Sequence, residues 1–425
     1  MTIDQRDPEV RIAKLLDNGK FELLIPRTDC GMVAATGEIK GNRVVVFASD
    51  ATLQGGALGA DGAHVIVEAY KSAMGSQLPI IGIWHSGGAR LRDGVSSLSA
   101  FGEVFQSMIT ASGRIPQLSL VLGPTAGGGA YGPALTDIVV LAPNGRIFVT
   151  GPDVVKSVTG EKIDIATLGG PDAHRKNSGV AHVIAHSEEE AFAEIRDLTS
   201  LFSDQGRLNT DLVDEDLAMY VPAATKRAYE VHPLIDAILD RDGEKLELLP
   251  MWAENMTTVI GRFGGRTVGV LANNPQHLGG VLDSSAAEKA ARFVRTCDAF
   301  GIPLIVIADV PGFLPGTGQE WEGAVRRGAK LLHAFGEAVV PRVTLITRRA
   351  YGGAYVAMNS KSLGATRVFA WPTAEVSVMG AVAAVRVLHR RLLADIPQEQ
   401  RESMELELAA EHDRVSGGVE RAIEI

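Results

Sequence analysis

Three glycine-rich clusters are the parts of this sequence whose residue types and spacing are best suited to chemistry. They are SGGAR at Ser86–Arg90, TAGGGAYGPA at Thr125–Ala134 and AYGGAY at Ala350–Tyr355. Glycine lets the backbone approach a ligand closely and adopt positive φ, and a helix that begins at such a turn directs several free N–H groups at one place. Two N–H groups aimed at one oxygen form an oxyanion hole, in which losing one donor costs ~2.7–4 kcal/mol of transition-state stabilisation.

Tight packing is the alternative explanation, and for any single cluster it is the simpler one, because a glycine pair often fills a narrow space between a strand and a helix. The repetition of the clusters at matching positions favours chemistry instead. Each copy would supply one oxyanion hole, which suits a reaction with two carbonyl groups to polarise.

The chain contains an internal repeat that spans about half its length. Pro26 and Pro250 end similar segments and lie 224 positions apart. The same register places Gly55-Gly56 over Gly279-Gly280, and it becomes 225 where the segment from Ile115 lies over that from Val340. A single register held through so many glycines and prolines indicates a duplicated domain.

Short β-branched runs alternate with helical spacing in both copies. Runs such as RVVVFA, PIIGIW, LSLVLG and DIVVLA, then TVGVLA, PLIVIAD and VTLIT, predict buried strands, and ADGAHVIVEAYKSAM and SAAEKAARFVRTCDAF predict helices. This alternation predicts an α/β fold with ligands at the carboxyl ends of the strands. We expect domains at 1–215 and 216–425, joined within the charged, turn-rich stretch 203–226.

Composition narrows the functional classes. The 425 residues suit two domains, and a net charge of −10 argues against nucleic-acid binding. Two cysteines, Cys30 and Cys297, support neither a disulfide framework nor a zinc site. The N-terminus does not resemble a signal peptide, and the apolar runs are too short to span a bilayer. We therefore expect a soluble, cytoplasmic protein that binds no metal.

Several long motifs resemble one family. They are SGGARLRDG, TAGGGAYGPALTD, LANNPQHLGGVLDSSAAEKAARFVRTCDAFGIPL, DVPGFLPGTGQEWEG, RRGAKLLHAF, AYGGAY and FAWPTAEVSVMGA. Together they resemble the carboxyltransferase β subunits of biotin-dependent acyl-CoA carboxylases, of the acetyl-/propionyl-CoA, actinobacterial type, from about Asp7 onward. The resemblance implies tandem duplicated crotonase-like (ClpP/crotonase) domains, the N-terminal one for acyl-CoA and the C-terminal one for biotin. Each active site would lie between the N-copy of one subunit and the C-copy of another.

The resemblance also implies roles for individual residues. Gly127, Gly128 and Gly129 would bind the thioester enolate oxygen, and Gly353 and Ala354 the ureido oxygen of biotin, although which hole serves which substrate stays open. Further substrate-binding positions would be Gly87, Gly88, Ala89, Arg90, Tyr131, Tyr351, Tyr355 and Val356.

The family chemistry requires no catalytic Asp, Glu or His from this chain, because carboxybiotin itself becomes the base when it loses CO2. The protein would supply orientation, exclusion of water and the two holes. The implied partners are a biotin carboxylase and a biotin carboxyl carrier subunit. A shared active site requires a homo-oligomer, at least a dimer and in the family also a hexamer.

Val356 departs from many propionyl-CoA-type relatives, which carry Asp after the GGAY motif. An aliphatic residue there favours acetyl-CoA, giving malonyl-CoA. One methylene in a pocket is worth only ~1–3 kcal/mol, so we also expect activity with propionyl-CoA. A preference for propionyl-CoA or a longer acyl-CoA is the alternative.

Other features leave alternatives open. His85 stands where relatives often have Asp, and a packed or solvated imidazole explains it better than catalysis. Arg90, Arg92 and Lys156 would suit CoA phosphates, but solvated surface charge explains them equally well. Ser86 lacks the flanks of a hydrolase nucleophile elbow. Family members usually continue beyond the final GGVERAIEI with a strand and a helix.

Two other functional classes remain alternatives. A crotonase-type hydratase or isomerase would need a carboxylate as general base beside the acyl chain, and no motif supplies one. A non-catalytic scaffold subunit would not need both glycine clusters intact.

Overall fold

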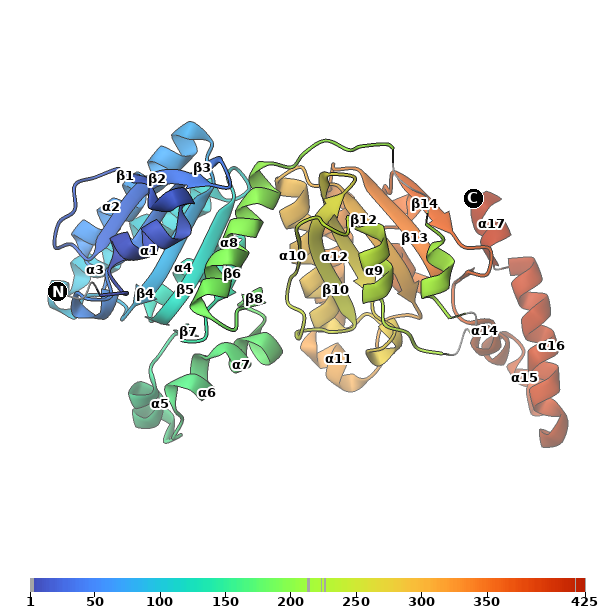
Figure 1. The fold of residues 1–425 in the computed structure, drawn as a ribbon. Coiled ribbons are helices and arrows are strands. Elements are labelled where there is room, and N and C mark those ends of the chain that lie inside the picture. Colours follow the sequence, from blue (N-terminus) through green and yellow to red (C-terminus); the bar gives the residue numbers. More distant parts are fainter. Residues whose placement is uncertain (1–3, 212–214, 223, 225–226, 417, 425) are drawn as a thin grey trace. The chain divides into compact units, whose positions relative to one another are not determined.

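The computed structural model describes the chain except residues 1–3, 212–214, 223, 225–226, 417 and 425 (Figure 1). Backbone contacts divide the chain into two compact units. Unit 1 comprises Met1–Arg207 and Glu244–Trp252, and unit 2 comprises Leu208–Gly243 and Ala253–Ile425. No helix among the described residues is both long and apolar enough to cross a membrane.

Unit 1 is built on a mixed sheet. Its strands are β1 (Phe21–Leu23), β2 (Met32–Ile39), β3 (Asn42–Ser49), β4 (Ile80–Ser86), β5 (Gln117–Ala126), β6 (Ile138–Leu141), β7 (Arg146–Phe148) and β8 (Val183–Ile184). The second segment of the unit contains β9 (Lys245–Glu247), which is not a strand of this sheet. The strand order is β1-β2-β3-β4-β5-β6-β8, and β7 also pairs β5. Strands β3 to β6 run parallel, so their carboxyl ends meet at one edge.

The helices of unit 1 follow these strands. They are α1 (Pro8–Leu15), α2 (Ala60–Ser76), α3 (Val95–Ala111), α4 (Gly128–Leu135), α5 (Pro152–Thr159), α6 (Ile165–Gly169), α7 (Pro171–Ala173) and α8 (Glu188–Ser203). Short helical turns cover 17–19, 54–56, 91–93 and 174–178. One apolar cluster joins the inner faces of α2 and α3 to the sheet, with Phe47, Tyr70 and Trp84 among its aromatic members.

Unit 2 repeats this plan. Its strands are β10 (Met256–Phe263), β11 (Arg266–Asn273), β12 (Leu304–Val310), β13 (Arg342–Tyr351), β14 (Arg367–Ala370) and β15 (Glu375–Ser377). Within the unit the order is β14-β13-β12-β11-β10, and β15 pairs β13. Strands β10 and β11 form an antiparallel hairpin, whereas β11 to β14 run parallel.

The helices of unit 2 include a long C-terminal group. They are α9 (His232–Ile238), α10 (Ser284–Ala299), α11 (Thr317–Glu322), α12 (Ala324–Glu337), α13 (Gly352–Ala357), α14 (Ala381–Leu388), α15 (Arg390–Ala394), α16 (Gln398–Ser416) and α17 (Gly418–Glu424). Short turns cover 217–220, 278–280 and 361–363. The predicted strands and the two predicted helices are therefore confirmed as β3 to β6, β11 to β13, α2 and α10.

The duplication is visible in backbone irregularities as well as in sequence. The β4–β5 register shifts between Trp84 and Ser86, and the β12–β13 register shifts between Ala308 and Val310, 224 positions later. Gly56 and Gly280 adopt nearly the same positive φ, 75° and 78°. Both copies thus share the local distortions that shape the carboxyl edge of each sheet.

Candidate active site

The loop after β4 exposes one backbone N–H group through a short β-bridge. Leu58 N–H donates to Gly88 O and Arg90 N–H donates to Leu58 O, each at 2.9 Å. The intervening Ala89 therefore directs its own N–H away from Leu58. Leu58 follows β3, and β5 lies on the other side of β4, so the Ala89 N–H faces the end of β5. Among the described residues it has no hydrogen-bond acceptor.

The start of α4 supplies further N–H groups. Gly127 turns the chain with φ 59° and ψ −130°, a conformation that requires glycine. Its own N–H donates to Phe148 O at 3.2 Å, so Gly127 shapes the turn and is not a free donor. The first helical bond runs from Ala130 N to Gly127 O at 3.1 Å. The N–H groups of Gly128 and Gly129 precede that bond and have no partner within the helix.

The loop and the helix start lie against each other. A Cβ atom added at Gly88 would lie 3.1 Å from Ala126 O, and one at Gly129 would lie 3.2 Å from Ser86 Oγ. Ser86 is also paired with Thr125 across the strands. The backbone N–H groups of Ala89, Gly128 and Gly129 therefore border one space, and we call them the N-terminal donor set.

Unit 2 contains the same arrangement. Leu282 N–H donates to Gly312 O at 3.0 Å, and Leu314 N–H donates to Leu282 O at 2.7 Å. Phe313 between them directs its N–H toward β13, at whose end α13 begins. The N–H groups of Phe313, Gly353 and Ala354 form the C-terminal donor set.

Phe313 is a donor that sequence reasoning missed. The peptide N–H carries no residue-type signal, and an aromatic side chain does not suggest a catalytic role. Only the register could have found it, because Phe313 lies 224 positions after Ala89.

The glycines of α13 have different structural roles. Gly352 has φ +56°, and an added Cβ would lie 2.8 Å from Val378 O, so the turn requires glycine there. Gly353 has ordinary φ, and an added Cβ would meet nothing within 4 Å. Ala354 is buried. Gly353 therefore opens onto the space beside its N–H group, where a ligand oxygen can approach.

Side chains around the donor sets are apolar or aromatic. Tyr131 on α4 is 50% exposed, and its ring packs edge-on against Phe105 with centroids 6.3 Å apart. Val356 on α13 is 40% exposed. Tyr355 is half-buried, and burial raises the pKa of its hydroxyl, so the side chain is neutral at physiological pH. These residues can line an acyl chain without adding charge.

Of the residues predicted to meet the CoA phosphates, Arg90 makes a contact within the protein, whereas Arg92 and Lys156 are exposed to solvent. Arg90 donates from Nη2 to Cys30 O at 2.8 Å, which fixes the loop after β4 to the segment before β2. Arg92 and Lys156 are exposed. The structure therefore gives Arg90 a structural contact beside its predicted role.

His85, at the end of β4, is packed in the protein. Its ring occupies space that Gly123 leaves open, since a Cβ there would lie 2.3 Å from Nδ1. Arg11 Nη1 lies 3.4 Å from the same nitrogen. Burial and, secondarily, the charges of Arg11 and Arg6 lower the pKa of His85 to about 4, so the ring is neutral at pH 7. No group of three or more His, Cys, Asp or Glu side chains among the described residues is placed to hold a metal ion.

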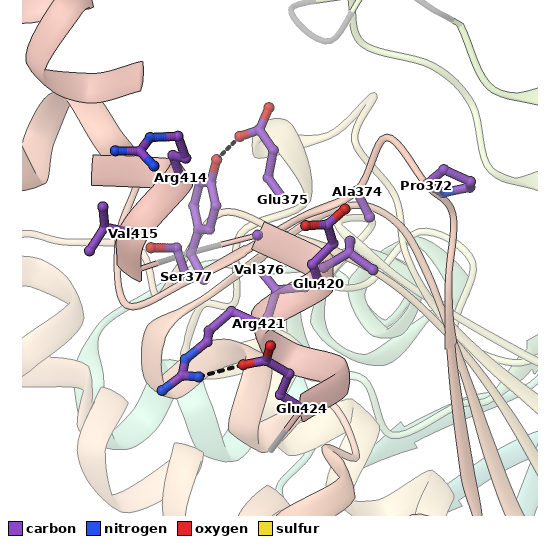
Figure 2. Close-up of a pocket in the computed structure, with 13 residues that line it drawn as sticks. Pro372, Ala374, Glu375, Val376, Ser377, Arg414, Val415, Glu420, Arg421 and Glu424 are labelled. Atoms are coloured by element: carbon purple, nitrogen blue, oxygen red, sulfur yellow. Dashed lines mark hydrogen bonds and ion pairs between the residues drawn. The ribbon is translucent and has the colours of Figure 1, made fainter. Parts of the chain in front are cut away.

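A cavity of about 590 Å³ lies beside the start of α13 in unit 2 (Figure 2). Tyr351 forms one wall, and β15, α16 and α17 supply the others. The Tyr351 hydroxyl donates to Glu375, the first residue of β15, which turns the phenol toward that strand. Gly353 and Ala354 of the C-terminal donor set are not among the residues that line this cavity.

Each unit thus presents converging backbone donors at the carboxyl edge of a parallel sheet, the arrangement that stabilises an oxyanion. Together with the strand order and the repeat, this defines the class of protein as one with a duplicated crotonase-like fold, as predicted.

The comparisons identify the family. Residues 14–422 match the carboxyl transferase domain family. The chain is 57% identical to the biotin-dependent acetyl-/propionyl-coenzyme A carboxylase beta6 subunit of Mycobacterium tuberculosis, covering 100% of this chain and 90% of that protein. It is 56% identical to the propionyl-CoA carboxylase beta chain of Rhodococcus erythropolis, covering 98% and 89%. The transcarboxylase 12S structure superposes with a TM-score of 0.92 at 36% identity, covering 98% of this chain and 84% of the other. The chain belongs to the carboxyl transferase domain family and is a carboxyltransferase subunit of the acyl-CoA carboxylase type.

Proposed function

We propose that this chain transfers a carboxyl group from carboxybiotin, carried on a partner protein, to the α-carbon of a short acyl-CoA. The observation that carries the proposal is the occurrence of one donor set in each unit. A reaction with two carbonyl oxygens that gain negative charge needs two such sets.

The N-terminal donor set would bind the thioester oxygen. Hydrogen bonds from Ala89 and Gly128 stabilise the enolate more than the neutral thioester, and this difference lowers the barrier to removing the α-proton. Each donor contributes ~2.7–4 kcal/mol by the usual measure of its removal. The set consists of backbone groups on a sheet edge, so it needs little rearrangement during the reaction.

The C-terminal donor set would bind the ureido oxygen of biotin. An added Cβ at Gly353 would meet nothing within 4 Å, which leaves room for a ligand beside its N–H group. When bound, carboxybiotin supplies the CO2 and the basic nitrogen that the chain itself lacks. The chain holds the two reactants in orientation and excludes water. In this proposal the domain at 1–215 serves acyl-CoA and that at 216–425 serves biotin.

The preferred substrate in this proposal is acetyl-CoA, with appreciable activity toward propionyl-CoA. Val356 supports it, since its isopropyl group is exposed on α13 and can offer an acyl chain an apolar surface without adding charge. The Mycobacterium relative is named for both substrates. Propionyl-CoA as the main substrate is the second candidate, supported by the name of the Rhodococcus relative.

The proposed partners are a biotin carboxylase and a biotin carboxyl carrier subunit, because carboxybiotin must be made and delivered. We further propose a homo-oligomer, a dimer at least. The transcarboxylase 12S is described as a hexamer, which supports the same assembly here.

The test is the reverse reaction, malonyl-CoA-dependent carboxylation of free biotin, with methylmalonyl-CoA assayed in parallel. It requires neither ATP nor a partner subunit. We expect turnover with both and a higher kcat/KM for malonyl-CoA. Methylmalonyl-CoA favoured by more than about a hundredfold would refute the acetyl preference, and no turnover with either from a folded oligomer would favour a scaffold role.

A further inference from the structure

The two copies satisfy one equivalent carbonyl group in different ways. In unit 1, Gly55 O accepts a hydrogen bond from the backbone N–H of Gly87 at 2.9 Å. In unit 2, the equivalent Gly279 O accepts from the Arg349 guanidinium, with Nη2 at 3.2 Å. A side chain therefore takes the place of a backbone donor.

A proline in unit 2 explains why a side chain replaces the backbone donor. The residue equivalent to Gly87 is Pro311, 224 positions later, and proline has no N–H. Without Arg349, the Gly279 carbonyl would lose its bond to the end of β13. The guanidinium thus takes the place of the missing N–H on the Gly279 carbonyl, and it also bonds Asp309, two residues before Pro311.

A buried carboxylate fixes the guanidinium in that position. Asp309, which is fully buried, accepts from Arg349 Nε at 2.9 Å and from Arg348 Nε at 2.8 Å. Arg348 is itself held by a bond to Arg227 O at 2.7 Å and lies over the Tyr229 ring. Asp309 is the last residue but one of β12, so the same carboxylate ties β12 to the end of β13.

Unit 1 has no such ion network at the equivalent positions. Asp309 corresponds to the neutral His85, and Arg348 and Arg349 correspond to Gly123 and Pro124. The network and the proline thus occur together in one copy, and the backbone bond occurs in the other.

We propose that Arg349, oriented by Asp309, is a positioning residue for the C-terminal donor set. It joins the turn at Gly279 to Asp309, directly before the Pro311–Leu314 loop, and so keeps the Phe313 N–H aligned with Gly353. The effect on turnover rests on the proposed function, whereas the effect on the loop does not.

The first experiment compares R349M with R266M. Arg266 makes the same kind of contact at the opposite end of the strands, with Nη2 3.3 Å from Gly301 O, so R266M is a matched control. We expect R349M to lower kcat for malonyl-CoA-dependent biotin carboxylation by about 10- to 100-fold. We expect KM for malonyl-CoA to change by less than about threefold, because the N-terminal donor set is untouched. R266M should retain wild-type kcat.

The decisive variant restores the missing donor. P311A supplies a backbone N–H where unit 1 has Gly87. In the double variant R349M/P311A we expect recovery of at least about tenfold in kcat over R349M. A residue that stabilises the fold in general would not be rescued at this site. Full activity of R349M, or no recovery in a folded double variant, would overturn the proposal.

Hydrogen exchange separates this inference from the proposed function. Peptides that cover residues 309–316 should exchange faster in R349M than in the wild type or R266M, and P311A should reverse the change. Unchanged exchange in R349M would overturn the positioning role whatever the activity. Faster exchange in R349M, found together with a wild-type chain that lacks carboxyltransferase activity, would uphold the role in the loop and refute only the proposed function.

Discussion

Replacing Gly353 with valine separates catalysis from folding more clearly than any other change in the C-terminal donor set. Gly353 is the second residue of α13, has ordinary φ, and has nothing within 4 Å of an added Cβ. The helix can therefore accept a side chain there. Valine and glycine differ in helix propensity by less than about 1 kcal/mol, so we expect the free energy of unfolding to change by no more than that.

The effect on activity should be much larger. The isopropyl group would occupy the open space beside the Gly353 N–H and keep the ureido oxygen of biotin from reaching it. Losing one donor of this kind lowers kcat by ~10²–10³. Exclusion of the ring itself would raise KM for biotin as well, whereas binding of malonyl-CoA to the N-terminal donor set should stay the same.

The assay is carboxylation of free biotin by malonyl-CoA, with melting temperature measured on the same preparations. G336V is the matched control, since Gly336 lies on α12 of the same unit and an added Cβ would meet only Leu363 Cδ1 at 3.9 Å. A G353V protein that is folded and keeps more than about a tenth of the wild-type kcat would refute the assignment of this N–H as a donor.

Two further outcomes can be measured with single variants. V356D should shift the ratio of kcat/KM for methylmalonyl-CoA to that for malonyl-CoA upward by about 10-fold, because one methylene is worth ~1–3 kcal/mol in such a pocket; an unchanged ratio would remove Val356 from the acyl pocket. His85 should make unit 1 sensitive to acid. Its pKa is about 4 in the folded protein against 6.5 in the unfolded chain, so the unfolded state binds more protons between these values and stability falls as pH is lowered through this window. H85Q should reduce that loss of stability by about 1–3 kcal/mol, and we expect a value near the lower end because the ring is partly exposed. An equal fall in melting temperature for wild type and variant between pH 7 and pH 4 would contradict this.

Much of the fold could be predicted from sequence because its signals are local. The β-branched runs that became β4 and β12 predict buried strands, and the repeat predicts two copies of one unit. The glycine clusters were recognisable for the same reason, since positive φ at Gly127 and Gly352 restricts the residue type.

The remaining parts of the site depend on tertiary contacts. The Gly127 N–H was predicted as a donor with its neighbours, but only the folded chain brings Phe148 O to it. Phe313 and Arg349 carry no pattern that marks them. Their roles follow from a β-bridge and from a carbonyl 70 residues earlier in sequence, at Gly279.

The donor sets are made of backbone N–H groups, so substitution of side chains does not remove the donors themselves. An alanine scan removes side chains and leaves N–H groups in place, so it should report little at Phe313. It cannot test Ala89, which is already alanine, or Gly353, which has no side chain to remove. It should instead report strongly at Asp309 and Arg349, which touch no substrate in our proposal but hold the backbone in position. The donors repeat in both copies of the duplicated domain. The residues that support them differ between the copies: unit 1 has the neutral His85 where unit 2 has an ion network around Asp309. Differences between the two sites therefore lie in the supporting side chains, and substitutions there can adjust one site without altering the other.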